Sequence, residues 1–136
     1  MSRILLHSIY TIVVSIVLNV IVFFIGTALS ISWATSDEII GVGAVIIASI
    51  IGAAIGIIGF LVLRFFLGER SRIWFIWLAT IFGVLSLFGP WAAASDIGTL
   101  VFLGMMHVVS VLVMTWYLGV WAPTYIAADE LIAPSS

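Results

Sequence analysis

The side chain best suited to chemistry in this sequence is His107, which lies in the apolar run "GMMHVVSV" at residues 104–111. A histidine in such a run can bind a metal or haem, carry a proton or contact a substrate, or hold a neutral hydrogen bond between helices. Ser110 follows it at helical spacing, on the same face of a helix. Asn19 is the polar residue of the first apolar stretch that needs a partner most. These residues form the first candidate site.

Other catalytic constellations are absent from the sequence. The chain has no cysteine, which excludes disulfides, thiol catalysis and metal sites built on thiolates. The apolar stretches hold no carboxylate. The second histidine, His7, falls near the inner end of the first stretch, about half the membrane away from His107. No glycine-rich nucleotide loop and no Gly-x-Ser-x-Gly motif occurs. We therefore expect no enzyme, no catalytic residue, no metal ligand and no cofactor.

The composition predicts an integral membrane protein. Of the 136 residues, 65% are hydrophobic and only 7% are charged, whereas a soluble domain carries roughly a quarter of charged residues. A domain of this size has too little interior to hide so much apolar surface, so the lipid bilayer is the expected solvent. The net charge of −2 argues against nucleic acid as a partner, because nucleic acid requires a basic surface.

The charged residues divide the chain into four apolar stretches. Each stretch exceeds the roughly 20 residues that cross a hydrocarbon core as a helix. The first is too long for the apolar region of a cleavable signal peptide, and the short connections favour antiparallel neighbours. The sequence predicts an all-α membrane protein with a single domain over 1–136. It is a four-transmembrane-helix antiparallel bundle, with helices over about 5–30, 40–66, 73–90 and 98–121 and a tail over 122–136.

The arginines predict the orientation of this bundle. All four lie at one set of helix ends, whereas the opposite loops contain acidic residues and no basic residue. By the positive-inside rule, both termini and the tail are cytoplasmic, an N-in/C-in arrangement in the plasma membrane. The four arginines are Arg3, Arg64, Arg70 and Arg72.

Polar residues on the helices predict a contact layer near the middle of the membrane. A rise of 1.5 Å per residue puts Asn19 and His107 at similar depth. Serine can satisfy itself on the backbone carbonyl one turn earlier, but an asparagine amide cannot do so as easily and should point inward. The candidate layer comprises Asn19, Ser49, Ser86, His107 and Ser110.

Small residues predict where the helices approach one another. In lipid, close packing at small side chains replaces much of the hydrophobic drive between helices. The second helix carries such residues at a spacing of four, and the third and fourth helices offer glycines as well. These positions favour packing within the chain or a seam between copies, so a homo-oligomer or a larger membrane complex stays open. The predicted packing positions are Ala44, Ala48, Gly52, Gly56, Gly83 and Gly104.

Three short motifs resemble those of a known family. They are "RSRIW" after the second loop, "LSLFGP" closing the third helix and "MMHVV" in the fourth. Together they are similar to an uncharacterised family of small four-helix integral membrane proteins of bacteria and archaea, described only as a domain of unknown function. The resemblance is strongest from Arg70 to Met114 and places Pro90 and His107 at motif positions. It implies the fold and no activity.

Three hypotheses about function follow. The leading one is a structural or accessory membrane protein that acts through helix–helix contacts, because the helices carry small-residue stripes and no buried charge. The alternative is a small transporter or channel with a mid-membrane polar site at His107 and Asn19. A second alternative is a redox subunit that binds haem or a metal, with His107 as the ligand.

Overall fold

A computed structural model describes residues 3–121, and this part of the chain is helical apart from two loops. No strand occurs within these residues, so the all-α prediction is confirmed. The predicted tail over 122–136 lies outside the described residues. The elements in chain order are α1 (Arg3–Ala28), α2 (Val42–Leu67), the 3-10 turn η1 (Gly68–Arg70), α3 (Ser71–Ser86), α4 (Phe88–Ala93), α5 (Ile97–Met114) and the π-helical turn η2 (Thr115–Trp121).

Among the described residues, three helical segments are long and apolar enough to cross a membrane: Leu5–Ala28, Val42–Ala93 and Ile97–Val120. The first and third match the helices predicted over 5–30 and 98–121. The helices predicted over 40–66 and 73–90 belong to one helical segment of 52 residues, so the described residues show three apolar segments where the sequence predicted four. α3 alone has only 16 residues, about 24 Å, which is shorter than a hydrocarbon core of about 30 Å.

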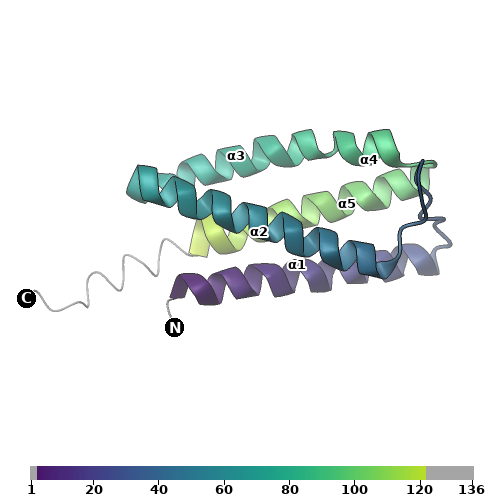
Figure 1. The fold of residues 1–136 in the computed structure, drawn as a ribbon, viewed down its shortest axis with the longest axis horizontal. Helices are drawn as coiled ribbons and strands as arrows, with labels where there is room; N and C mark the ends of the chain where they lie inside the picture. The colour runs from purple at the N-terminus through teal and green to yellow at the C-terminus, as the bar shows by residue number, and fades with distance from the viewer. Residues whose placement is uncertain (1–2, 122–136) are drawn as a thin grey trace, which may run out of the picture.

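The long segment reverses its direction at Gly68. This residue has a φ of 54°, a left-handed conformation that glycine adopts without steric cost. Its N–H donates to the Arg64 carbonyl and closes the end of α2. The Arg64 guanidinium in turn donates to the Gly68 carbonyl at 3.3 Å. As a result, α2 and α3 run side by side in opposite directions (Figure 1).

A break at Leu87 separates α3 from α4. Pro90 lies in the first turn of α4, where its missing N–H would have no partner inside that helix. The proline therefore does not end the helical segment, which continues three residues further than predicted, to Ala93. The carbonyl of Pro90 then accepts from the N–H of Ala94 at 2.9 Å, where the helix ends.

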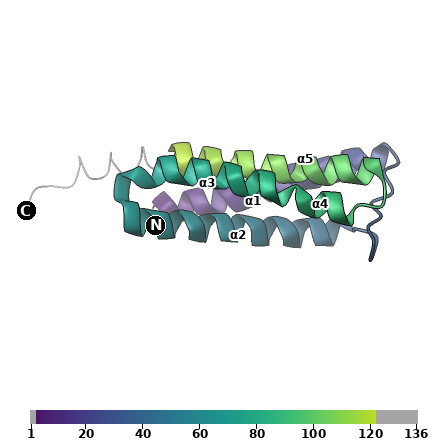
Figure 2. The same ribbon diagram turned by 90° about the horizontal axis from the view of Figure 1, so that it is seen from above.

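The helices are arranged so that α1 and α3 lie on opposite sides of the molecule. α1 packs against α2 and α5, and α3 packs against the same two helices (Figure 2). The loops over 29–41 and 94–96 lie together at one end, which we call the loop end (Figure 1). The Gly68 turn and the start of α1 lie at the other, which we call the hairpin end.

Backbone hydrogen bonds join the two loops at the loop end. The N–H of Ser36 donates to the Ala93 carbonyl, and the N–H of Ser95 donates to the Ala34 carbonyl, both at 3.0 Å. Thr35 and Ala94 form an antiparallel bridge between these bonds. The chain before α2 is therefore fastened directly to the end of α4.

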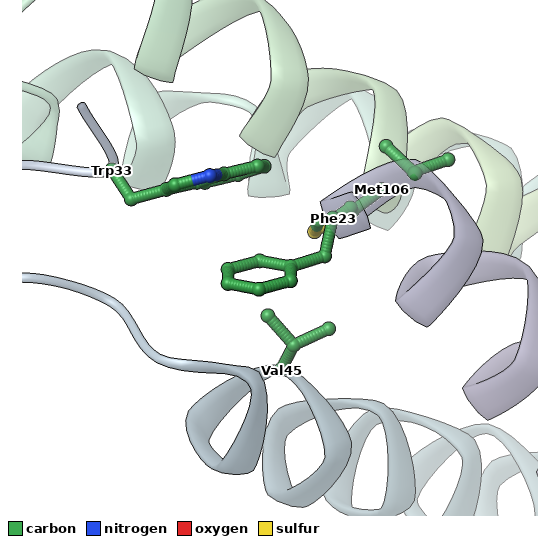
Figure 3. Close-up of a cluster of buried hydrophobic side chains, with 5 residues drawn as sticks. Phe23, Trp33, Val45 and Met106 are labelled. Atoms are coloured by element: carbon green, nitrogen blue, oxygen red, sulfur yellow. The ribbon is translucent and has the colours of Figure 1, made fainter. Parts of the chain in front are cut away.

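Each end of the molecule has its own apolar core. At the loop end, Trp33 is 4% exposed and stacks on Phe23 with 4.6 Å between ring centroids. Val45 and Met106 complete this cluster from α2 and α5 (Figure 3). A Cβ at Gly26 would lie 2.4 Å from the Trp33 ring, so the indole requires glycine there. The core at the hairpin end contains Phe60, Phe75 and Leu118.

Candidate functional site

Asn19 lies at the meeting point of three helices. It is on α1, only 4% exposed, and its Nδ2 donates to Ser49 Oγ on α2 and to Ser110 Oγ on α5, both at 2.9 Å. Such bonds between membrane helices average about 0.6 kcal/mol each, enough to fix the register of the helices. The structure thus brings together Asn19, Ser49 and Ser110 from the predicted polar layer.

The hydrogen atoms around Asn19 can be assigned from its two serine partners. Ser49 Oγ donates to the Val45 carbonyl at 2.7 Å, and Ser110 Oγ donates to the Met106 carbonyl at 2.9 Å. Each hydroxyl has one hydrogen, and a carbonyl can only accept, so both serines must accept from Asn19. This fixes the amide with Nδ2 toward the serines. Among the described residues, the buried Asn19 Oδ1 has no hydrogen-bond partner.

The other two members of the predicted layer do not bond to Asn19. His107 Nδ1 lies 2.8 Å from the Leu103 carbonyl, so in the neutral ring Nδ1 carries the hydrogen and Nε2 is an acceptor. Ser86 Oγ donates to the Gly83 carbonyl at 2.7 Å. Both side chains bond to the backbone of their own helix, one turn earlier. Depth along the helix axis could be predicted from the sequence, and so could the option of a serine to bond to its own helix. That His107 bonds to its own helix in the same way was not predicted.

A crevice of about 830 Å³ lies between α2 and α3, with α5 as its floor. Ile55 on α2 and Phe82 on α3 lie along it and are 66% exposed each, so the crevice opens sideways between these helices. In Figure 1, α2 and α3 are closest beside the Gly68 turn and draw apart toward the loop end. All the residues of the predicted polar layer line this crevice: Asn19, Ser49, Ser86, His107 and Ser110.

The small residues of α2 divide into packed and open positions. A Cβ at Gly56 would lie 2.1 Å from Met114 Sδ, and one at Gly83 on α3 would lie 2.6 Å from a Val111 methyl, so these two glycines allow close packing on α5. A Cβ at Gly52 would meet nothing within 4 Å.

Within this chain Gly52 therefore packs against no other helix, and a seam between copies at this position stays a prediction. Ala44 and Ala48 are exposed, and they line the crevice together with the half-buried Gly52. The reason is the divergence of α3 from α2, which leaves the loop-end half of the stripe uncovered. A Cβ at Gly104 would meet only Leu87 within 4 Å, at 3.9 Å. The crevice was not predicted from the sequence, although the stripe of small residues on α2 was the signal for it.

The charges near the crevice are few and of one sign. Glu38, in the loop before α2, is the one charged residue among those that line it, and no arginine of the described part does so. The remaining lining is mostly apolar, with isoleucine, valine, phenylalanine and methionine side chains. The crevice thus offers an apolar volume with a polar floor and an acidic group near the loop end.

Asp96 organises the loop end without reaching the crevice. Its Oδ1 accepts from the Thr99 N–H at 2.9 Å and so caps α5, and its Oδ2 accepts from the hydroxyls of Ser32 and Thr99. The Ser32 hydrogen bond, followed by those of Thr99, lowers the pKa of Asp96 from 3.8 to about 2. An aspartate directly before an apolar run is the sequence signal for this cap.

Within residues 3–121, no group of three or more histidine, cysteine, aspartate or glutamate side chains is placed to hold a metal ion. His7 is buried near the start of α1, at the hairpin end, whereas His107 lies in the middle of α5.

Fold and site together define a helical protein with three segments apolar enough to cross a membrane and a lateral crevice with a polar floor. The chain belongs to the family described as "Family of unknown function (DUF6069)", whose model matches residues 1–122. The resemblance to an uncharacterised family carried by "RSRIW", "LSLFGP" and "MMHVV" is thereby confirmed. No curated protein and no solved structure matches the chain.

Proposed function

We propose that this protein spans the plasma membrane four times and that both of its termini are cytoplasmic. The reversal at Gly68 supports two crossings by the segment Val42–Ala93. Residues 71–93 make a helical path of about 34 Å, long enough for one crossing when α3 and α4 are taken together. The arginine-bearing hairpin end then faces the cytoplasm, and the loop end, with Asp37, Glu38 and Asp96, faces outward.

Because the chain has no cysteine, single cysteines can test this topology directly. In intact cells, a membrane-impermeant maleimide should label Ser36→Cys at the loop end. It should label Glu69→Cys at the hairpin end only after the membrane is permeabilised. The reverse pattern would overturn the orientation, and labelling of both variants in intact cells would overturn the four crossings.

In this frame the protein binds a membrane-soluble molecule in the crevice between α2 and α3, without catalysis. The crevice itself carries this proposal. Its volume of about 830 Å³ falls within the range of roughly 300–1,000 Å³ typical of small-molecule sites, and such sites are mostly apolar with a few polar groups. The opening between Ile55 and Phe82 would face the acyl chains of the bilayer, which gives an apolar molecule direct access.

This function corresponds to the transporter hypothesis more closely than to a purely structural role, because binding in mid-membrane is the first step of transport. A second candidate is the accessory role, in which a helix of another protein or another copy occupies the crevice. The open positions Ala44, Ala48 and Gly52 favour it, since small residues allow close approach of a helix. A redox role has no comparable support, because the described residues offer no clustered ligands.

The decisive experiment fills the crevice with a side chain. Gly52→Leu introduces its side chain where a Cβ meets nothing within 4 Å, so the helix should tolerate it. The matched control is Gly43→Leu, also on α2 and also free of contacts within 4 Å, but not lining the crevice. Tritiated farnesol, an apolar alcohol, serves as the probe for each protein in lipid nanodiscs, measured by scintillation proximity.

The wild type and Gly43→Leu should bind farnesol saturably, and Gly52→Leu should bind it at least about tenfold more weakly, as expected for loss of more than about 1.4 kcal/mol of contact. If all three proteins take up no more farnesol than empty nanodiscs, the binding function is refuted. If Gly52→Leu instead changes the oligomeric state and leaves farnesol binding intact, the accessory role replaces it.

A further inference from the structure

We infer that the molecule bound in the crevice presents a hydroxyl hydrogen to the Asn19 carbonyl, so that the site selects apolar alcohols or phenols over apolar molecules that only accept hydrogen bonds. This inference rests on the proposed function, because it names the class of molecule that the same crevice takes. Its basis is the distribution of hydrogen-bond donors and acceptors along the lining.

The hydroxyl donors that line the crevice are already used. Ser49, Ser86 and Ser110 each donate to a carbonyl of their own helix, at 2.7, 2.7 and 2.9 Å respectively. Both hydrogens of Asn19 Nδ2 go to two of these serines. A carbonyl or ether oxygen of a ligand therefore finds no hydroxyl or amide hydrogen left for it on these side chains.

Two acceptors of the lining, in contrast, receive no hydrogen from the described residues, although the Asn19 oxygen is itself covered and a ligand reaches it only when the side chains over it move aside. Asn19 Oδ1 belongs to a side chain that is 4% exposed and lines the crevice, and it has no partner among the described residues. His107, which also lines the crevice, uses Nδ1 on the Leu103 carbonyl and keeps the Nε2 lone pair. A buried acceptor without a partner is unfavourable. A ligand that brings a hydrogen to Asn19 removes that penalty, and a ligand without one leaves it in place.

The charge of the lining narrows the class further. Among the described residues that line the crevice, none is basic, so a carboxylate or phosphate head would have no counter-charge. An ammonium group would meet Glu38 only near the loop end, and at the mid-membrane depth of Asn19 a charge is costly. A neutral hydroxyl satisfies Asn19 at no such cost.

The test compares two probes that differ only in the hydrogen. Farnesol carries a hydroxyl, and farnesyl methyl ether has the same chain and no donor. In nanodiscs the wild type should bind the ether about 2- to 10-fold more weakly than the alcohol, the effect of one neutral hydrogen bond. Asn19→Leu should lower the affinity for farnesol to that for the ether and leave the affinity for the ether unchanged. Thr80→Ala is the control, since its hydroxyl donates to the Ile76 carbonyl and Thr80 does not line the crevice, and it should keep the preference.

The outcomes separate this inference from the proposed function. If the wild type binds alcohol and ether equally, and Gly52→Leu abolishes both, the site exists and the selection for a hydroxyl is overturned. If Asn19→Leu retains the preference for farnesol, the assignment to Asn19 is overturned. If neither probe binds saturably, the proposed function itself falls. The comparison of the two probes on the wild type decides the matter even where Asn19→Leu does not fold.

Discussion

Asn19 makes more bonds between helices than any other side chain of the candidate site, yet replacing it with leucine should not destabilise the protein. The change removes two hydrogen bonds of about 0.6 kcal/mol each. It also removes the buried Oδ1 acceptor that has no partner within the described residues, which relieves about 1–3 kcal/mol. The free energy of unfolding of the ligand-free protein should therefore stay the same or rise by up to about 2 kcal/mol.

The two serine partners should behave in the opposite way. Ser49→Ala or Ser110→Ala removes one hydrogen bond and leaves one hydrogen of the Asn19 amide without an acceptor. The lost bond and the unpaired donor together cost about 2–4 kcal/mol. The periphery of the cluster should thus be more sensitive to substitution than its centre.

The free energy of unfolding can be measured in mixtures of dodecylmaltoside and SDS by far-UV circular dichroism, in protein freed of bound lipid. Ser86→Ala provides the control, because its hydroxyl contacts only a carbonyl of its own helix, and it should change stability by less than about 1 kcal/mol. A result in which Asn19→Leu is more destabilising than either serine variant would refute the assignment of an unpartnered acceptor.

Three further predictions concern packing and the loop end. Gly56→Leu should destabilise by about 1–3 kcal/mol in the same SDS titration, because its Cβ would lie 2.1 Å from Met114 Sδ, whereas Gly52→Leu should not. Trp33→Ala should lower the free energy of unfolding by about 3–5 kcal/mol and speed hydrogen exchange over residues 29–41. Unchanged stability would show that the indole contributes nothing to the core. Asp96, with its pKa lowered to about 2 from 3.8, stabilises the fold fully above about pH 4 and loses this effect as the pH falls to about 2. The wild type should therefore lose more stability than Asp96→Asn across this window, and equal losses would contradict the assignment.

The sequence allowed the helical segments to be predicted well, because gaps between charges mark their ends. The gap that ends at Asp96 anticipates the start of α5, and Asp96 indeed caps that helix. The division between α3 and α4 could not be predicted, because Leu87 carries no helix-breaking signal and Pro90 is tolerated in a first helical turn. The count of apolar segments depends instead on the helical turn Gly68–Arg70, which joins α2 and α3 into the segment Val42–Ala93.

For the candidate site, the depth of the polar residues along the helices could be predicted from the sequence, but their hydrogen-bond partners could not. The rise per residue places Asn19 level with residues on other helices, which is where Ser49 and Ser110 are. His107 was a natural partner by type, but the Leu103 carbonyl one turn away is a nearer acceptor. The stripe of small residues through Gly52 indicated close approach of another helix to α2. Whether a neighbouring helix covers the stripe depends on the angle between α2 and α3, and no local sequence pattern determines that angle.

The bonds between the two loops have a mechanical consequence for the crevice. Its two walls are fastened at the loop end through residues 34–36 and 93–95, and at the hairpin end through Gly68. A slot held at both ends cannot open like a hinge and can widen only by bowing of a wall. α2 is the softer wall, since Gly52, Gly56 and Gly59 follow one another there and glycine weakens the stiffness of a helix. Under the proposed function, the fixed end points limit the length of the bound molecule, and a molecule wider than the resting slot requires α2 to bow.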